Sequence, residues 1–90
     1  MRRTQSNAFF QIWSRPNDLG HARLGVVAAK KIDKRAVGRN RVKRLVREAF
    51  RHHAARLSGV DLIVRAKQPL KRSNCADARA ALERLLVRFV

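Results

Sequence analysis

The clearest pattern in the chain is a helical spacing of apolar residues over residues 38–53 (GRNRVKRLVREAFRHH). Apolar side chains recur there at steps of three and four residues, which lines them along one side of a helix; they are Val42, Leu45, Val46, Ala49 and Phe50, with His53 at the end of the row. The opposite side is polar and basic, and carries Asn40, Lys43, Arg44, Arg47 and Arg51. We expect a long helix, capped by Asp33, that ends near Leu57 with Ser58-Gly59 as its stop.

A second helix is expected after a loop at residues 68–74, with Ser73 or Asn74 as its cap and Asp77 in its first turn. Its apolar row consists of Ala78, Leu82, Leu85, Leu86 and Phe89. Between the helices, residues 61–67 are expected to form a strand, with Leu62, Val64 and Ala66 on one face and Ile63 and Arg65 on the other.

Two further strands are expected before the long helix, at residues 8–14 and 23–29, where aromatic, branched and small apolar residues dominate. The turn-forming run Pro16-Asn17-Asp18-Leu19-Gly20 separates them, so we expect these two strands to form an antiparallel hairpin with a longish loop. Residues 1–7 are polar and fit either a frayed end or an edge strand.

These elements predict a single domain over residues 1–90 of the α+β class, a small two-layer sandwich with a short mixed sheet. Both helices would cover one face of the sheet, and the other face would be freer. The long helix lies in a strand–helix–strand crossover, and such crossovers are right-handed in about 98 % of cases. General physics therefore predicts a right-handed connection.

Charge changes the interpretation of the long helix. The chain has 22 Lys and Arg residues against six Asp and Glu residues, a formal net charge of +16. Lys43–Arg47 and Arg47–Arg51 are pairs of like charge one helical turn apart, and they repel each other. The one acidic residue of this helix, Glu48, could pair with Arg44, and nothing else in the helix would neutralise the basic side. An ordinary solvated helix mixes both signs of charge. The unneutralised row indicates a polyanionic partner.

Composition also limits the chemistry. The six acidic residues are scattered one per element, without the paired spacing that a metal-dependent nuclease requires, so we expect no catalytic residue and no metal site on this chain. His52 and His53 point in different directions on a helix, His53 fits a core boundary, and His21 lies in a loop where it could contact RNA. The single cysteine, Cys75, is expected to be a small buried residue in a protein of the cytoplasm. No apolar run is long enough to span a membrane, and no secretory signal is present.

The residues that best fit RNA binding form a dense basic segment with one amide: Lys30, Lys31, Arg39, Asn40, Arg41, Lys43, Arg44, Arg47 and Arg51. Such density gives salt-sensitive attraction to phosphates with little base specificity. On the first long strand, Phe9, Gln11 and Trp13 share a face and could stack on single-stranded RNA. The alternatives are that Phe9 and Trp13 are packing residues and that Asn40 is a helix cap.

The run Arg39-Asn40-Arg41-Val42-Lys43-Arg44-Leu45-Val46-Arg47, preceded by Ala36, Lys30-Lys31 and the strand segment Arg23-Leu24-Gly25-Val26-Val27, resembles the signature of the bacterial ribonuclease P protein component. The resemblance extends from about Phe9 to the end of the chain. It implies a left-handed crossover, contrary to the general rule. It also implies an N-terminal helix with aromatic residues, for which there is no room before Phe9, and an apolar residue where this chain has Asp33.

In functional terms the resemblance implies the protein subunit of a ribonucleoprotein endoribonuclease, in which a catalytic RNA uses Mg²⁺ to remove the 5′ leader of precursor tRNA. The catalytic RNA subunit would contact the basic segment from Lys30 to Arg47, and the leader would follow the sheet near Phe9 and Gln11. A 1:1 complex of a monomer with the RNA is expected. Two alternatives remain: a ribosomal-type structural RNA-binding protein, and a DNA-binding module that places Arg39, Asn40 and Arg41 in a major groove.

Overall fold

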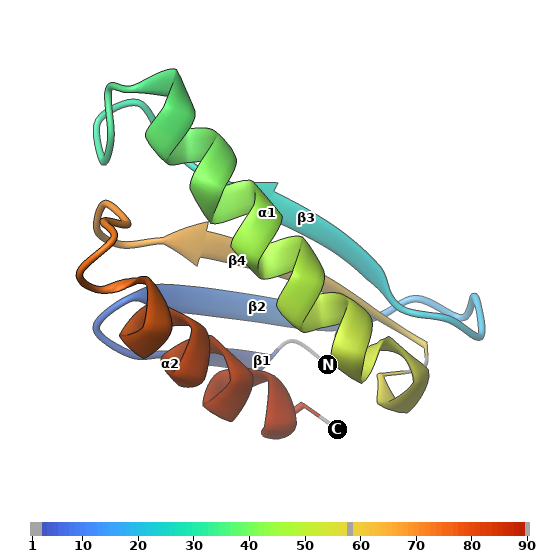
Figure 1. Ribbon diagram of the computed structural model, residues 1–90. Coiled ribbons are helices and arrows are strands. Elements are labelled where there is room, and N and C mark those ends of the chain that lie inside the picture. The colour runs from blue at the N-terminus through green and yellow to red at the C-terminus, as the bar shows by residue number, and fades with distance from the viewer. Residues whose placement is uncertain (1–2, 58, 90) are drawn as a thin grey trace.

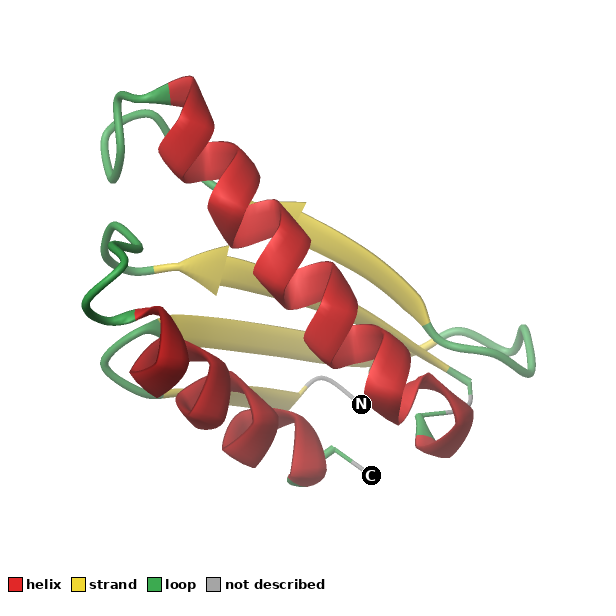
Figure 2. Ribbon diagram, in the orientation of Figure 1, coloured by secondary structure: helices red, strands yellow, loops and turns green. Residues whose placement is uncertain are grey.

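The computed structural model describes residues 3–57 and 59–89, which form two helices packed on one face of a four-stranded sheet (Figures 1 and 2). The strands are β1 (Arg3–Ser6), β2 (Phe10–Pro16), β3 (Arg23–Val27) and β4 (Val60–Ala66). The helices are α1 (Ala36–His53) and α2 (Cys75–Val87), and a short 3₁₀ turn, η1 (Ala54–Arg56), follows α1. No helix within the described ranges is both long enough and apolar enough to cross a bilayer.

The strand order is β1-β2-β4-β3, and this corrects the predicted hairpin. Strand β2 pairs antiparallel with β1 and β4, whereas β3 pairs only with β4, in parallel. Strand β4 therefore lies between the two strands that were expected to pair with each other. The loop at residues 17–22 therefore passes the start of β4 to reach β3 and does not join two paired strands. Of the two interpretations of residues 1–7, the edge strand is confirmed for Arg3–Ser6, whereas residues 1 and 2 lie outside the described residues.

The connection from β3 through α1 to β4 is left-handed. In Figure 1 both helices lie in front of the sheet, β3 and β4 point to the left, and β3 lies above β4. The chain leaves β3, crosses in front of the sheet as α1 and returns to the sheet at β4, below β3. With both strands pointing to the left and the helix in front, a return below the first strand makes the crossover left-handed. The default expectation of a right-handed crossover is wrong here, and the hand implied by the resemblance is confirmed.

The predicted apolar rows meet between the helices and the sheet. On α1, Val42, Val46 and Ala49 are buried, while Leu45 and Phe50 are partly buried against the same core. Every residue of the apolar row predicted for α2 is buried. From the sheet, alternate residues point into this layer and are Phe10, Ile12, Leu62, Val64 and Ala66. Residues between them, such as Trp13 and Ile63, face the other side, which neither α1 nor α2 covers.

The start of α1 differs from the prediction that Asp33 caps it. The N-cap is Arg35, which makes no side-chain capping bond, and Asp33 lies two residues earlier. The carboxylate of Asp33 accepts a hydrogen bond from the backbone N–H of Arg35 at 3.0 Å and is buried against Gly38. A Cβ at position 38 would collide with that carboxylate, so glycine is required early in this helix by close approach.

The other helix boundaries follow the sequence more closely. Helix α1 ends at His53 and η1 continues the chain to a buried Leu57; Ser58 lies outside the described residues, and Gly59 has the positive φ of 72° expected of a stop. Asn74 is the N-cap of α2, but its side chain accepts a hydrogen bond from the N–H of Lys71 at 2.7 Å instead of one from the helix. Asp77 occupies the first turn as predicted.

Candidate nucleic-acid interface

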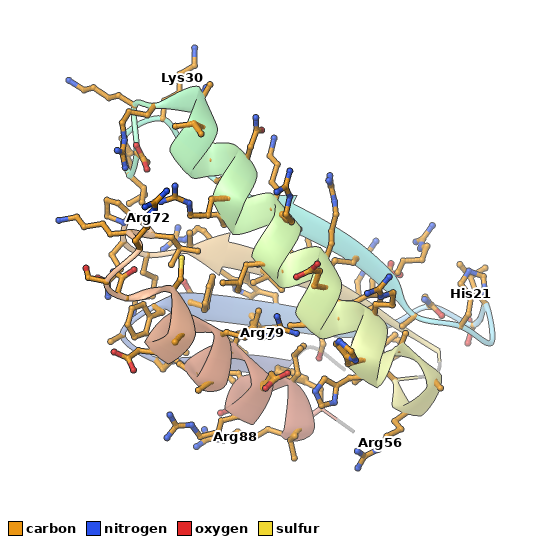
Figure 3. The ribbon with its side chains drawn as sticks, viewed as in Figure 1. His21, Lys30, Arg56, Arg72, Arg79 and Arg88 are labelled. Carbon is orange, nitrogen blue, oxygen red and sulfur yellow. The ribbon has the colours of Figure 1, made fainter. Side chains whose placement is uncertain are left out.

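The outer side of α1 carries the predicted basic residues, and we call this surface the basic face. Figure 3 shows side chains with nitrogen tips projecting from α1 away from the sheet, continuing to Lys30 in the loop before the helix. The residues that form the basic face are exposed, except for a partly buried Lys43; they are Lys30, Lys31, Asn40, Lys43, Arg44, Arg47 and Arg51. Asn40 is the fifth residue of α1, so the interpretation of Asn40 as a terminal cap is wrong.

Arg39 and Arg41 have a second role, because both bind backbone carbonyls. Arg39 Nη1 donates to the carbonyl oxygens of Lys34, at 2.9 Å, and Asp33, at 3.2 Å. Arg41 Nη1 donates to the carbonyl of Leu70 at 3.2 Å and so ties α1 to the loop between β4 and α2. Each guanidinium has five N–H donors, so both arginines retain donors for a ligand.

Glu48, which was expected to neutralise part of the charge of the basic face, points toward α2 instead. Glu48 does not pair with Arg44; its Oε2 lies 3.6 Å from Nη1 of Arg79 on α2. Arg79 Nε also lies 3.9 Å from Glu83 Oε1, so Arg79 forms ion pairs with both glutamates of the chain. None of the ion pairs among the described residues involves Arg44, Arg47 or Arg51. The basic face therefore keeps its full charge for a polyanion.

The uncovered face of the sheet, which we call the open face, holds two of the three predicted leader-binding residues. Gln11 and Trp13 lie on β2 with their side chains on this face. Phe9 does not join them, because β2 begins at Phe10 and Phe9 occupies the preceding turn, partly buried against the core. The turn is fixed by Asn7, whose Oδ1 accepts the N–H groups of Phe9 and Phe10 at 2.9 Å each. Phe9 is therefore a packing residue, as the alternative interpretation had it.

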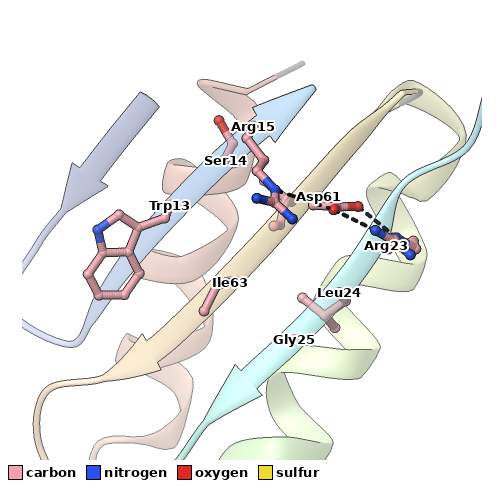
Figure 4. Close-up of a pocket in the computed structure, with 9 residues that line it drawn as sticks. Trp13, Ser14, Arg15, Arg23, Leu24, Gly25, Asp61 and Ile63 are labelled. Carbon is pink, nitrogen blue, oxygen red and sulfur yellow. Dashed lines mark hydrogen bonds and ion pairs between the residues drawn. The ribbon is translucent and has the colours of Figure 1, made fainter. Parts of the chain in front are cut away.

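A groove of about 560 Å³ crosses the open face (Figure 4). Beside Trp13, its lining includes residues that were not predicted to bind RNA: Arg15, Arg23, Gly25, Asp61 and Ile63. Trp13 and Ile63 are cross-strand neighbours, and the guanidinium carbon of Arg65 lies 5.6 Å from the centre of the Trp13 ring. An aromatic ring flanked by arginines on an exposed sheet is an arrangement that binds single-stranded nucleic acid.

Asp61 lies at one end of this groove between two arginines from neighbouring strands. Its Oδ1 accepts Arg23 Nε at 2.8 Å and Asn17 Nδ2 at 2.9 Å, and its Oδ2 accepts Arg23 Nη2 at 2.7 Å. Arg15 Nε lies 3.7 Å from Oδ2 on the other side. Hydrogen bonds from Arg23 and Asn17, aided by the charges of Arg23 and Arg15, hold the pKa of Asp61 well below its usual range.

This depressed pKa predicts acid lability. The unfolded chain takes up a proton at Asp61 below about pH 4, whereas the native state resists it, so the stabilisation is full above that pH and is lost as the pH falls toward the native pKa. We expect Asp61→Asn to lower the urea midpoint at pH 7, with the difference from the unsubstituted protein shrinking by pH 3. Asp77→Asn, whose carboxylate makes no ion pair among the described residues, serves as the control. A difference for Asp61→Asn that does not vary with pH would contradict the assignment.

The remaining candidate residues do not form a reactive cluster in the part of the chain that the structure describes. His52 and His53 line a shallow hollow between α1 and α2 together with Arg79, and no three His, Cys, Asp or Glu side chains there are placed to share a metal ion. His21 is exposed in the loop after β2, at the opposite end of the molecule from Lys30 (Figure 3). Cys75 is partly buried against the core.

The open sheet, the aromatic groove and a helix whose outer arginines have no acidic partner among the described residues together indicate a small α+β protein of the RNA-binding class. The chain belongs to the ribonuclease P protein family, because the family described as Ribonuclease P matches residues 1–90. Relatives named ribonuclease P protein component include one from Chromobacterium violaceum, 51 % identical over 89 residues, and one from Marinomonas sp., 45 % identical over 84 residues. These alignments cover 99 % and 90 % of this chain, which spans 74 % and 64 % of the two relatives.

Solved structures agree with this assignment. The RNase P protein from Thermotoga maritima in complex with 1-(4-fluorophenyl)-2-thiourea aligns with a TM-score of 0.72 and 28 % identity, over 98 % of this chain and 83 % of that one. The Staphylococcus aureus RNase P protein aligns with a TM-score of 0.73 and 29 % identity, over 98 % and 77 % of the two chains. The predicted family and the α+β fold are confirmed.

Proposed function

We propose that this chain acts as the protein subunit of ribonuclease P, binding the catalytic RNA subunit through the basic face and assisting removal of the 5′ leader from precursor tRNA. The observation that carries the proposal is the charge of α1: its outer side presents Arg44, Arg47 and Arg51 without an acidic partner among the described residues. Family membership supplies the identity of the RNA. Arg39 and Arg41 help by fixing the start of α1 and its neighbouring loop.

The contribution of the protein is electrostatic. Catalytic RNA and precursor tRNA are both polyanions, and a protein of net charge +16 between them screens their repulsion. This lowers the Mg²⁺ concentration needed for the two RNAs to dock. In this proposal the RNA subunit and its Mg²⁺ supply the chemistry, and the protein binds as a monomer in a 1:1 complex in the cytoplasm.

The leader is proposed to lie on the open face. Trp13 offers a stacking surface, Gln11 lies one step along the same face, and Arg65 stands over the indole ring. Base stacking on an aromatic side chain tolerates any sequence, which suits leaders that differ between tRNAs. Phe9 is left out of this surface, because it packs against the core.

Filling the groove tests this location. A Cβ at Gly25 would meet Ile63 Cγ1 at 3.8 Å, an ordinary contact, so Gly25→Leu should leave the fold intact while its side chain occupies the groove. We expect about a fivefold loss of affinity for leader-bearing precursor tRNA, the equivalent of one stacked base, and no change for mature tRNA. Ala76→Leu, exposed on α2, adds a similar bulk, one carbon less, away from the groove. Equal behaviour of the two variants would place the leader on another surface.

Reconstitution tests the function itself. Precursor tRNA cleavage is measured at low Mg²⁺ with a bacterial ribonuclease P RNA, with and without this protein, and with the protein alone. We expect cleavage to be stimulated only when both components are present. Tight RNA binding without stimulation would instead indicate a structural RNA-binding protein, and equal affinity for DNA of the same length would indicate a DNA-binding module.

A further inference from the structure

Asp61 is unusual as the one acidic residue that lines the groove on the open face. A carboxylate there repels any phosphate that enters, so its presence in a chain with only six acidic residues needs an explanation. The sheet register supplies one: Arg15, Asp61 and Arg23 are aligned partners on β2, β4 and β3. Figure 4 shows the Asp61 side chain between those of the two arginines.

The two arginines remain available although they contact Asp61. The side chains of Arg15 and Arg23 are 64 % and 57 % exposed, whereas that of Asp61 is 15 % exposed. Arg23 uses Nε and Nη2 for Asp61, which leaves its Nη1 and one Nη2 proton free. A guanidinium that makes two hydrogen bonds to one carboxylate loses most of its rotational freedom, so its remaining N–H groups point in a fixed direction.

We infer that Asp61 is a positioning residue for single-stranded RNA, which orients Arg15 and Arg23 so that their free N–H groups bind a leader phosphate next to a base stacked on Trp13. Trp13 and Arg15 are two residues apart on one face of β2, a separation of about 7 Å. An extended strand can therefore place a base on the ring and the adjoining phosphate at the arginines. The inference rests on the proposed binding of the leader to the open face.

Asp61→Asn separates positioning from simple charge. Removing a negative charge from a groove that binds RNA should tighten binding if Asp61 acts only through its charge. If Asp61 positions the arginines, the substitution should weaken binding of the leader. The two explanations thus predict opposite signs for one variant, and Asp77→Asn provides the matched loss of one negative charge on α2, away from the groove.

The experiment uses holoenzyme reconstituted with a bacterial ribonuclease P RNA and precursor tRNAs whose leaders range from none to eight nucleotides. With the unsubstituted protein, affinity is expected to rise with leader length. We expect Asp61→Asn to reduce that rise about tenfold, the factor for one lost charge-assisted hydrogen bond, without changing affinity for the leaderless tRNA. A rise that is unchanged or larger in Asp61→Asn would overturn the inference.

A second variant covers the case in which Asp61→Asn folds poorly. Arg23→Lys keeps the charge at an exposed position but loses the two-point contact with Asp61, so it should also reduce the rise with leader length; an unchanged rise would overturn the inference. Circular dichroism melting identifies any loss of fold in either variant. If the unsubstituted protein gives no rise with leader length, the proposed leader surface is itself wrong, whereas a rise that survives both substitutions contradicts only the role of Asp61.

Discussion

Replacing Arg44 and Arg47 together with alanine is expected to weaken binding of ribonuclease P RNA by roughly 10- to 100-fold at about 0.1 M salt. Both side chains are exposed on the basic face and neither pairs with an acidic residue among the described residues. Each phosphate contact releases condensed counterions, so losing two contacts should reduce the slope of log affinity against log salt by about 1.4 to 1.8. Filter binding or anisotropy over a series of salt concentrations measures both quantities.

The control for this pair removes two positive charges at positions away from the basic face. Arg56→Ala with Arg84→Ala changes the net charge equally, and both residues are exposed, one in η1 and one on α2. We expect the control to lower affinity slightly and to leave the salt slope nearly unchanged. If the two double variants have equal slopes, the RNA subunit does not contact α1 through the basic face.

Gly38→Ala is expected to destabilise the protein, although alanine ordinarily stabilises a helix relative to glycine by about 1 kcal/mol. A methyl group at this position collides with the buried carboxylate of Asp33, which must then give up its position and its hydrogen bond to the N–H of Arg35. Forced packing of this kind typically costs about 1–3 kcal/mol. For a domain of this size that corresponds to a melting temperature lower by about 4–8 °C per kcal/mol.

The sign of this effect depends on Asp33, and a double substitution shows it. In an Asp33→Ala background the carboxylate is absent, so Gly38→Ala should become neutral or stabilising, in line with its helix propensity. Melting temperatures of the four proteins form a double-mutant cycle whose interaction energy reports the contact. If Gly38→Ala has the same effect in both backgrounds, the close approach of Asp33 is not the reason for glycine at this position.

The parts of the fold that depend on local periodicity were predictable. The rows of Val42, Val46 and Ala49 on α1 and of Leu82, Leu85 and Leu86 on α2 recur every three or four residues, and the structure buries all six. Strand pairing was not predictable in the same way, because no residue near β2 or β3 in the sequence shows that β4 lies between them. Their common partner, β4, begins more than 30 residues after the end of β3.

The candidate site also has one part that local spacing predicts and one part that depends on strand pairing. The basic face follows from residue spacing within one helix, so the sequence was sufficient to locate it. The groove requires Arg15, Arg23 and Asp61, which approach one another only through the register of three strands. The start of β2 at Phe10 also depends on tertiary structure, since the side chain of Asn7 forms the turn that moves Phe9 toward the core. The alternation of side chains along a strand, taken alone, predicted that Phe9 shares the face of Gln11 and Trp13.

The pairing of both glutamates with Arg79 has a consequence for how the protein reaches its partner. Arg79 pairs with Glu48 of α1 and Glu83 of α2, and it lies at a distance from Lys30, which precedes the start of α1 (Figure 3). The outer arginines of α1 therefore act on an approaching RNA without local cancellation by these glutamates. Because the net charge is +16, attraction begins before any contact forms, and the association rate should decline as salt is added.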